Sequence, residues 1–233
     1  MADILSSPCW VKADDFAGAA FPNMYNLFVD RRDQHGGPFM RNKLNISSSN
    51  FHVAAVDPVE MPALSPTAPA PPATTAAAEA TATPPPSSAK MFPYMVAVPF
   101  TVSAEVCDAA PGGAVPCMAD GATSLLMDMV TSFHVMLACF PAMHGHVSLS
   151  IQANHMTPLQ CGRTYLAISR IDKMGRRIVY TSVDYVEPQL QPVHDTTDAA
   201  PAMNTTAELL TAMKSATVLA NLKHVKSILS SGV

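Results

Sequence analysis

The strongest hydrophobic pattern in this chain lies between residues 121 and 140. Apolar residues recur there three and four positions apart, which is the stripe of an amphipathic helix that packs against a sheet. The stripe consists of Ala122, Leu125, Leu126, Met129, Val130, Phe133, Met136, Leu137 and Phe140. Pro141 ends the pattern, because proline lacks the backbone N–H that a helix needs. We therefore predict one long helix over this segment.

Short runs of strand composition lie on both sides of this helix. We predict strands at 43–56, 94–106, 147–152, 164–171 and 176–186. The last two form a hairpin around a four-residue turn. One long helix set between antiparallel strands predicts an α+β layer architecture.

Additional helices are predicted near the two ends of the chain. Residues 17–29 have the spacing of a short helix. Near the C-terminus, Thr205 and Glu208 form the pattern of a capping box. We predict that this box opens a helix that continues to about Leu229.

A low-complexity segment rich in alanine, proline and threonine occupies residues 57–89. It has little to bury and cannot form regular backbone hydrogen bonds, so we predict a disordered insertion between two strands. A ligand for an SH3-type domain is the alternative interpretation. The chain then divides into an N-terminal extension at 1–42, a domain at 43–187 that contains the insertion, and a linker with the C-terminal helix at 188–233.

The composition of the 233 residues excludes several classes of protein. Charged residues make up only 14% and the net charge is −4, so the chain has no basic footprint for a nucleic acid. The five cysteines lack the spacing of a zinc site, which predicts reduced thiols and no structural metal. No apolar run reaches the roughly 20 residues of a membrane span. Because the N-terminal residues lack a signal-peptide pattern, we expect a cytoplasmic protein, with a mitochondrial location as the alternative.

The start of the long helix carries a motif with a known counterpart. Residues 118–128 read Met-Ala-Asp-Gly-Ala-Thr-Ser-Leu-Leu-Met-Asp. This run resembles the pattern Leu-His-Gly-Gly-x-x-x-x-Leu-x-Asp at the start of the central helix in PaaI-like thioesterases. Residues 146–158 and 181–184 resemble two later strands of the same family. The resemblance covers about residues 94–187 and implies a hotdog fold, in which an antiparallel sheet wraps around one long central helix.

The resemblance also implies a chemistry. In this family a carboxylate on the central helix attacks the thioester or activates water, and amides at the helix N-terminus hold the carbonyl oxygen. Asp128 matches this carboxylate, and Ser132 and Ser148 match groups that position the reactants. The amides of Asp120 and Gly121 are then the oxyanion donors. The expected activity is hydrolysis of acyl-CoA by a homodimer or homotetramer that needs no cofactor.

The sequence departs from the family motif at two positions that bear on its chemistry. Ala119 stands where the family has histidine, and Asp120 stands where it has the first glycine. The missing histidine polarises the thioester region in relatives, and the new carboxylate places negative charge beside the oxyanion donors. A catalytically inactive hotdog protein, which binds acyl-CoA or serves as a structural subunit, is therefore the alternative hypothesis. A hotdog hydratase or dehydratase is a third. The letters His-Gly-Gly at 35–37 are followed by no helical stripe, and we interpret them as a turn.

Coenzyme A carries phosphates, which require cationic partners. The candidates lie at the ends of the predicted hairpin: Arg163, Lys173, Arg176 and Arg177. Solubilising surface charge is the alternative interpretation of these residues. Four histidines near the helix or the strand after it are candidates to replace the family histidine in space: His134, His144, His146 and His155.

Overall fold

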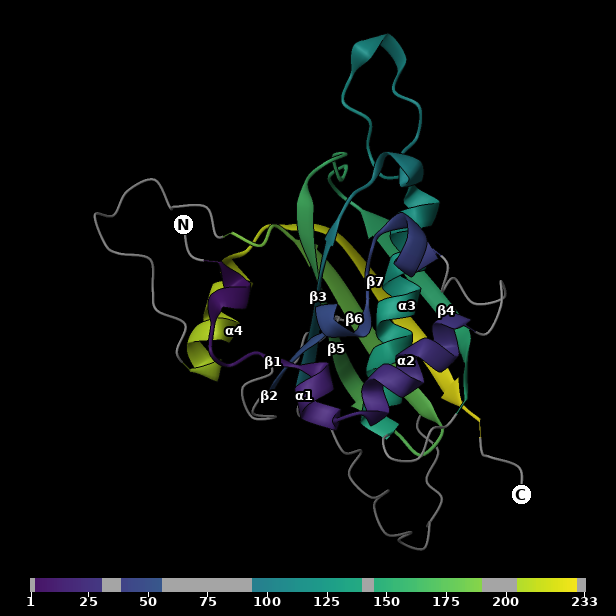
Figure 1. Cartoon of the computed structure of the whole chain (residues 1–233), viewed down its shortest axis with the longest axis vertical. Coiled ribbons are helices and arrows are strands. Elements are labelled where there is room, and N and C mark those ends of the chain that lie inside the picture. The colour runs from purple at the N-terminus through teal and green to yellow at the C-terminus, as the bar shows by residue number, and fades with distance from the viewer. Residues whose placement is uncertain (1–2, 31–38, 56–93, 140–144, 190–204, 230–233) are drawn as a thin grey trace, which may run out of the picture.

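The computed structural model describes residues 3–30, 39–55, 94–139, 145–189 and 205–229 (Figure 1). Within these ranges seven antiparallel strands form one sheet in the order β1-β2-β3-β5-β6-β7-β4. The strands are β1 (Val11–Lys12), β2 (His52–Ala55), β3 (Tyr94–Thr101), β4 (His146–His155), β5 (Thr164–Met174), β6 (Ile178–Val186) and β7 (Val218–Ile228). The α-helices are α1 (Ala13–Ala17), α2 (Ala20–Asp30), α3 (Asp120–Cys139) and α4 (Thr206–Ser215).

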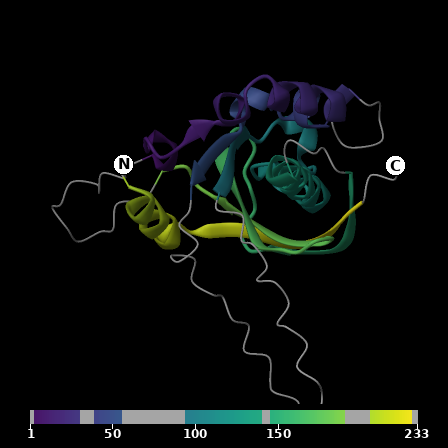
Figure 2. The same ribbon diagram turned by 90° about the horizontal axis from the view of Figure 1, so that it is seen from below.

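Helix α3 lies in the hollow of the curved sheet. Figure 2 shows this helix nearly end-on, with the sheet passing beneath it and rising at its sides, and with α1 and α2 on the opposite side. Its bounds agree with the predicted 121–140 to within one residue. The predicted α+β class, with one long helix against an antiparallel sheet, is therefore confirmed, and the arrangement is consistent with a hotdog fold.

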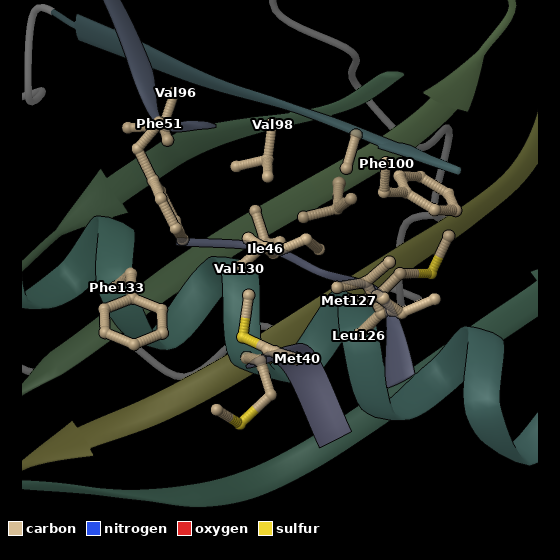
Figure 3. Packing of buried hydrophobic residues seen from close by; sticks show 14 of the residues in the cluster. Met40, Ile46, Phe51, Val96, Val98, Phe100, Leu126, Met127, Val130 and Phe133 are labelled. Atoms are coloured by element: carbon tan, nitrogen blue, oxygen red, sulfur yellow. The ribbon is translucent and has the colours of Figure 1, made fainter. Parts of the chain in front are cut away.

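The apolar stripe of α3 forms the centre of the core. Leu126, Val130 and Phe133 have no exposed surface, and Figure 3 shows them packed near Val96 and Val98 of β3. Burying such side chains stabilises the fold by about 1.5–3 kcal/mol each. The helix is thereby fixed in one rotation about its axis, which determines where its polar face points.

Aromatic side chains connect α2 to α3. Tyr25 of α2 stacks on Phe133 with ring centroids 5.1 Å apart, and Phe51 meets the same ring edge-on at 5.1 Å. The Tyr25 hydroxyl donates a hydrogen bond of 2.5 Å to the backbone carbonyl of Ile46. Ring pairs of this kind add about 0.5–1.5 kcal/mol beyond area burial. Helix α2 therefore closes the side of the core that the sheet leaves open.

Helix α4 covers part of the outer face of the sheet. Its Leu209 packs with Ile168 of β5 and with Trp10. The helix begins with a capping box, in which Thr205 Oγ1 accepts from the Glu208 amide at 3.3 Å and the Glu208 carboxylate accepts from the Thr205 amide at 2.9 Å. Each partner satisfies an amide that has no acceptor within the helix.

The prediction that this helix continues to Leu229 is wrong. It ends at Ser215, and Val218–Ile228 forms β7, which pairs with β6 on one side and with β4 on the other. Pairing on both edges satisfies the backbone groups of this segment within the sheet, so tertiary structure overrides the helical spacing. The sheet therefore extends beyond residue 187, where the predicted domain ends.

The first predicted strand is shorter than expected. Of residues 43–56, only His52–Ala55 form β2, and Ser48–Asn50 form a 3-10 turn. Asn45 adopts a φ of 52°, a left-handed conformation that interrupts an extended strand. The predicted insertion at 57–89 and the His-Gly-Gly run at 35–37 lie outside the described residues.

Among the helices that the structure describes, α3 alone has the length and apolar composition of a membrane span, with a mean hydropathy of 1.4. Of the apolar window, 67% is buried inside the fold. The core helix of a folded domain meets the same criterion, and the packing of α3 is that of a core helix.

Candidate active site

One face of α3 carries polar residues at intervals of four. Asp120, Ser124, Asp128 and Ser132 follow one another at this spacing, which places them on one side of the helix. We refer to these four residues as the polar stripe. Their side chains make contacts with residues of β4 and β7. The polar stripe of the central helix therefore faces the edge of the sheet that β7 and β4 form.

Asp128 is held by side chains from both strands. Lys226 Nζ lies 2.9 Å from Asp128 Oδ1, His224 Nδ1 lies 3.4 Å from it and Ser148 Oγ lies 3.5 Å from it. All three contacts are made to this one oxygen, and the Asp128 side chain remains 29% exposed. The carboxylate is thus anchored at one oxygen while part of it reaches the surface.

Lys226 is the buried cation of this group. Its side chain is 1% exposed, and its ammonium donates to Asp128 Oδ1 at 2.9 Å and to Ser132 Oγ at 2.8 Å. Burial lowers the pKa of Lys226, and the charge of Asp128 opposes this shift. Ser132 Oγ in turn donates to the backbone carbonyl of Asp128 at 2.8 Å. Ser132 is therefore a link that fixes the ammonium beside the carboxylate.

His224 makes a second buried contact to the same region. Its Nδ1 lies 3.0 Å from Thr131 Oγ1, which itself donates to the backbone carbonyl of Asp128 at 2.8 Å. Because the threonine proton is used there, we assign the imidazole proton to Nδ1, where it faces Thr131 and Asp128. Burial, and then the charge of Lys226, lower the pKa of His224 to about 4. The ring is therefore neutral at pH 7.

The register of the sheet explains why these side chains meet. Alternate residues of a strand face the same side, so His224 and Lys226 both point toward α3. Strand β4 pairs with β7 in a register that places Ser148 opposite Lys226. A β-bulge between Ser148 and Ser150 then shifts the following pairs by one residue.

The structure brings the predicted residues Asp128, Ser132 and Ser148 together. The sequence prediction missed Lys226 and His224, because it assigned both to a helix and gave them no role. Alternation along β7 was the available signal, since its inward positions are Leu222, His224, Lys226 and Ile228. Because His224 and Lys226 are polar, the inward positions do not show the apolar alternation by which a buried strand is recognised.

The other end of the polar stripe is the N-terminus of α3. The predicted oxyanion donors, the amides of Asp120 and Gly121, belong to the first turn, where backbone N–H groups have no acceptor within the helix. The chain before them is fixed, because the Ala119 amide donates to the Val106 carbonyl at 2.9 Å. The Asp120 side chain is 81% exposed, so solvent screens its charge beside these amides.

His155, at the end of β4, contacts two residues of the polar stripe. Its Nδ1 lies 3.5 Å from Asp120 Oδ1, and its Nε2 lies 3.4 Å from Ser124 Oγ. The His155 side chain is 27% exposed. Of the three candidate histidines that the structure describes, it is the one placed beside the helix N-terminus, whereas His134 is buried against Ser169 and His146 lies at the other end of β4. His144 lies outside the described residues.

The predicted CoA-binding cations do not form one cluster. Arg163 precedes β5 and contacts Glu187 and Gln160. Lys173 lies at the other end of this strand, roughly 30 Å away at about 3.3 Å per residue. Arg163 therefore lies far from the other three predicted cations, because a hairpin has two distant ends.

Arg176 and Arg177 line a pocket of about 360 Å³ at the β5–β6 turn. The pocket is otherwise bounded by apolar side chains and glycine: Cys139, Met174, Gly175, Ile228 and Leu229. It lies at the C-terminal end of α3, opposite the predicted oxyanion donors. Two arginines in an otherwise apolar lining make this pocket compatible with an anion.

Potential metal ligands are scattered. In the described parts of the chain, no group of three or more His, Cys, Asp or Glu side chains could hold a metal ion. The cysteines at positions 9, 107, 117, 139 and 161 are free thiols.

No protein-family model matches the sequence, and no curated protein matches it. Solved structures do match. Thioesterase superfamily member 2 from zebra fish aligns over 89% of this chain and 95% of its own, with 14% identity and a TM-score of 0.46. Thioesterase superfamily member 2 from Mus musculus aligns over 57% and 74%, with 17% identity and a TM-score of 0.37. The E. coli PaaI protein of the phenylacetic acid degradation operon aligns over 60% and 79%, with 12% identity and a TM-score of 0.39. Structures of the thioesterase superfamily, including PaaI, are thus among those that this chain resembles.

Proposed function

We propose that the protein is a thioester hydrolase that cleaves acyl-CoA to a free acid and coenzyme A, with Asp128 as general base or nucleophile. The observation that supports this proposal is the anchoring of Asp128 through one oxygen, by Lys226 and Ser148, while the side chain stays accessible. Fixing a reactive group before the substrate arrives removes an entropic cost from the reaction. Lys226 and Ser132 act on Asp128 and are positioning residues.

The spacing of residues along α3 supports a catalytic centre built from two copies of the chain. Gly121 and Asp128 are seven residues apart, which is about 10 Å along a helix. This is too far for an amide and a carboxylate to act on the oxygen and the carbon of the same carbonyl. A two-fold axis near the middle of this segment would place Asp128 of one copy opposite the Gly121 amide of the other. The proposed enzyme is therefore a homodimer or a dimer of dimers.

Strand β4 is the edge through which such a dimer would form. It is the last strand of the sheet, so one of its sides carries backbone groups without a partner strand among the described residues. It also exposes Val147, Leu149 and Ile151 to between 45% and 56%. An exposed apolar edge strand is a surface that pairs with another strand. A second copy of β4 would extend the sheet and bring the two polar stripes together.

The phosphates of coenzyme A are proposed to lie near the β5–β6 turn. Arg176 and Arg177 offer fork-shaped donors in the lining of the 360 Å³ pocket, and Lys173 is close in the chain. Arg163 is left out of this proposal because it lies at the far end of β5.

The proposal is tested by hydrolysis of a panel of acyl-CoA thioesters by wild type and Asp128→Asn. Loss of a general base or nucleophile is expected to lower kcat/KM by a hundredfold or more. Equal rates for the two proteins would overturn the proposal. Retained binding of acyl-CoA without turnover by the wild type would instead support the inactive subunit.

The variant needs a control for folding, because it leaves the buried ammonium of Lys226 without a counter-charge. Breaking a buried pair in this way costs about 3–5 kcal/mol of stability. The double variant Asp128→Asn/Lys226→Met removes both charges and is expected to regain most of this stability while remaining inactive. Recovery of activity in the double variant would mean that misfolding, and not the missing carboxylate, inactivated the single variant.

A further inference from the structure

Ser124, His155 and Asp120 stand in the order of a nucleophile, a base and a group that orients the base. His155 Nε2 faces Ser124 Oγ at 3.4 Å, and His155 Nδ1 faces Asp120 Oδ1 at 3.5 Å. The two ring nitrogens are thus assigned to different partners, as in Ser-His-Asp hydrolases. Both distances exceed a normal hydrogen bond by a few tenths of an ångström, a separation typical of such groups before a substrate binds.

The fold builds this arrangement from two elements that other contacts hold in place. Asp120 and Ser124 are one turn apart on α3, so they present their side chains on the same face. His155 is paired with Ala220 in the ladder between β4 and β7, which turns its ring inward. The adjacent Met156 and Thr157 amides both donate to the Leu219 carbonyl, at 3.0 and 2.9 Å. The backbone that carries His155 is therefore held both by the strand and by the loop that follows it.

The helix N-terminus adds a site for negative charge within reach of Ser124. The Gly121 amide lies three residues from Ser124, about 4.5 Å along the helix axis, whereas it lies seven residues, or about 10 Å, from Asp128. A carbonyl carbon at Ser124 Oγ can therefore direct its oxygen toward the free amides of the first turn, and the helix dipole favours an oxyanion there. In a single chain, Ser124 is better placed than Asp128 to share a carbonyl with these donors.

We propose that Ser124 is a covalent nucleophile for acyl transfer, activated by His155, on accessible esters or thioesters. Ser124 Oγ forms a bond to the acyl carbon as its proton passes to His155 Nε2. The tetrahedral oxyanion collapses, the bond to the leaving oxygen or sulfur breaks, and that atom takes the proton from His155. Water then attacks the acyl-serine, gives a proton to His155, and releases the carboxylic acid as Ser124 Oγ is reprotonated.

This centre does not require the chemistry proposed for Asp128, and it accounts for the departure from the family motif. The family histidine position is Ala119, and His155 brings an imidazole to the same end of the helix from a different strand. Asp120, which replaces a glycine of the motif, supplies the orienting carboxylate. Because that carboxylate is 81% exposed, its pairing with His155 contributes little, and most of the effect must come from Ser124 and His155.

The experiment is covalent labelling of the full-length protein by a fluorophosphonate probe, followed by intact-mass and peptide mass spectrometry. The expected product has one phosphonyl group on Ser124 Oγ, with fluoride as the leaving group and the proton taken by His155. Labelling is expected to disappear in Ser124→Ala and to slow by a hundredfold or more in His155→Ala. Asp120→Asn is expected to slow it only a few-fold. Alanine favours helices, so Ser124→Ala should fold, which circular dichroism checks.

Ser150→Ala is the matched control, because Ser150 is an exposed serine of β4 and the polar stripe does not include it. This variant is expected to be labelled at the wild-type rate. Absence of a label on Ser124, or an unchanged rate in His155→Ala, would overturn the proposal. Labelling does not involve coenzyme A or turnover, so its outcome is independent of the acyl-CoA assay that tests Asp128.

Discussion

Lys226 is the main electrostatic feature of the candidate site. An ammonium that is 1% exposed must be compensated within the protein, and Asp128 and Ser132 provide this at 2.9 and 2.8 Å. The same contacts hold Asp128 in one orientation. His224 lies beside the ammonium and avoids a second buried charge by remaining neutral. The cluster therefore contains one cation and one anion, with neutral groups around them.

Acid should destabilise the protein through His224. Its pKa is about 4 in the fold against 6.5 in an unfolded chain, so the unfolded state binds the extra proton as the pH falls from 6.5 to 4. The contribution of His224 to folding stability is therefore complete above pH 6.5. It is lost toward pH 4, and the loss is on the order of 3 kcal/mol. Urea unfolding at pH 7 and pH 4.5 measures the loss. His134, with a pKa of about 3 because of burial, acts with the same sign.

The variant His224→Asn checks the assignment. Asparagine can still donate to Asp128 but does not titrate, so the loss of stability between pH 7 and pH 4.5 should shrink. An identical loss in wild type and variant would show that His224 is not the group responsible.

Strand β7 is the element that completes the site. Its inward positions supply both His224 and Lys226, and its two edges join β6 to β4. The segment Val218–Ile228 also contains Leu222 and Val225 at a helical spacing, so the local pattern does not choose between helix and strand. Pairing on both edges decides for the strand.

Neighbouring substitutions in β7 should differ sharply in their effect. Leu222 has no exposed surface and packs in the main core, whereas the next residue, Lys223, is exposed. We expect Leu222→Ala to lower the free energy of unfolding by about 2–5 kcal/mol. Lys223→Ala should change it by less than about 1 kcal/mol. Chemical denaturation measures both, and similar losses at the two positions would contradict the described register.

The exposed edge of β4 determines how the whole molecule is expected to assemble. The proposed active site pairs the helix N-terminus of one copy with Asp128 of another, so activity and association should be coupled. Burial of the apolar residues on β4 would stabilise an assembly at this edge. Because they are exposed in one copy, changing them should not disturb the fold.

Leu149→Lys should convert the proposed dimer to a monomer and abolish the acyl-CoA hydrolysis that depends on Asp128. Leu149 is 56% exposed, and a lysine there would have to be buried without a partner when two β4 strands pair. Light scattering after size-exclusion chromatography gives the mass, and circular dichroism checks the fold. Tyr180→Lys, at a residue of β6 that is 45% exposed, is the matched control and should remain dimeric. A wild-type monomer with full activity would contradict the two-copy site.

The local sequence was enough to predict α3, the α+β class and the presence of the Asp128 carboxylate on that helix. These follow from local information, because a buried helix shows its period over five turns and a motif at its start is contiguous in the chain. The hairpin of β5 and β6 was also predictable, since its two strands and their turn are adjacent.

Contacts between distant parts of the chain make residues 218–228 a strand and bring Lys226, His224 and His155 to the polar stripe. Their contacts with α3 join residues 31 to 98 positions apart. No local period encodes such contacts, and the two polar residues that face inward from β7 interrupt the alternation by which a strand is recognised. Lys226 and His224, which give the site its cation and its buried imidazole, are therefore the residues that conceal the strand that carries them.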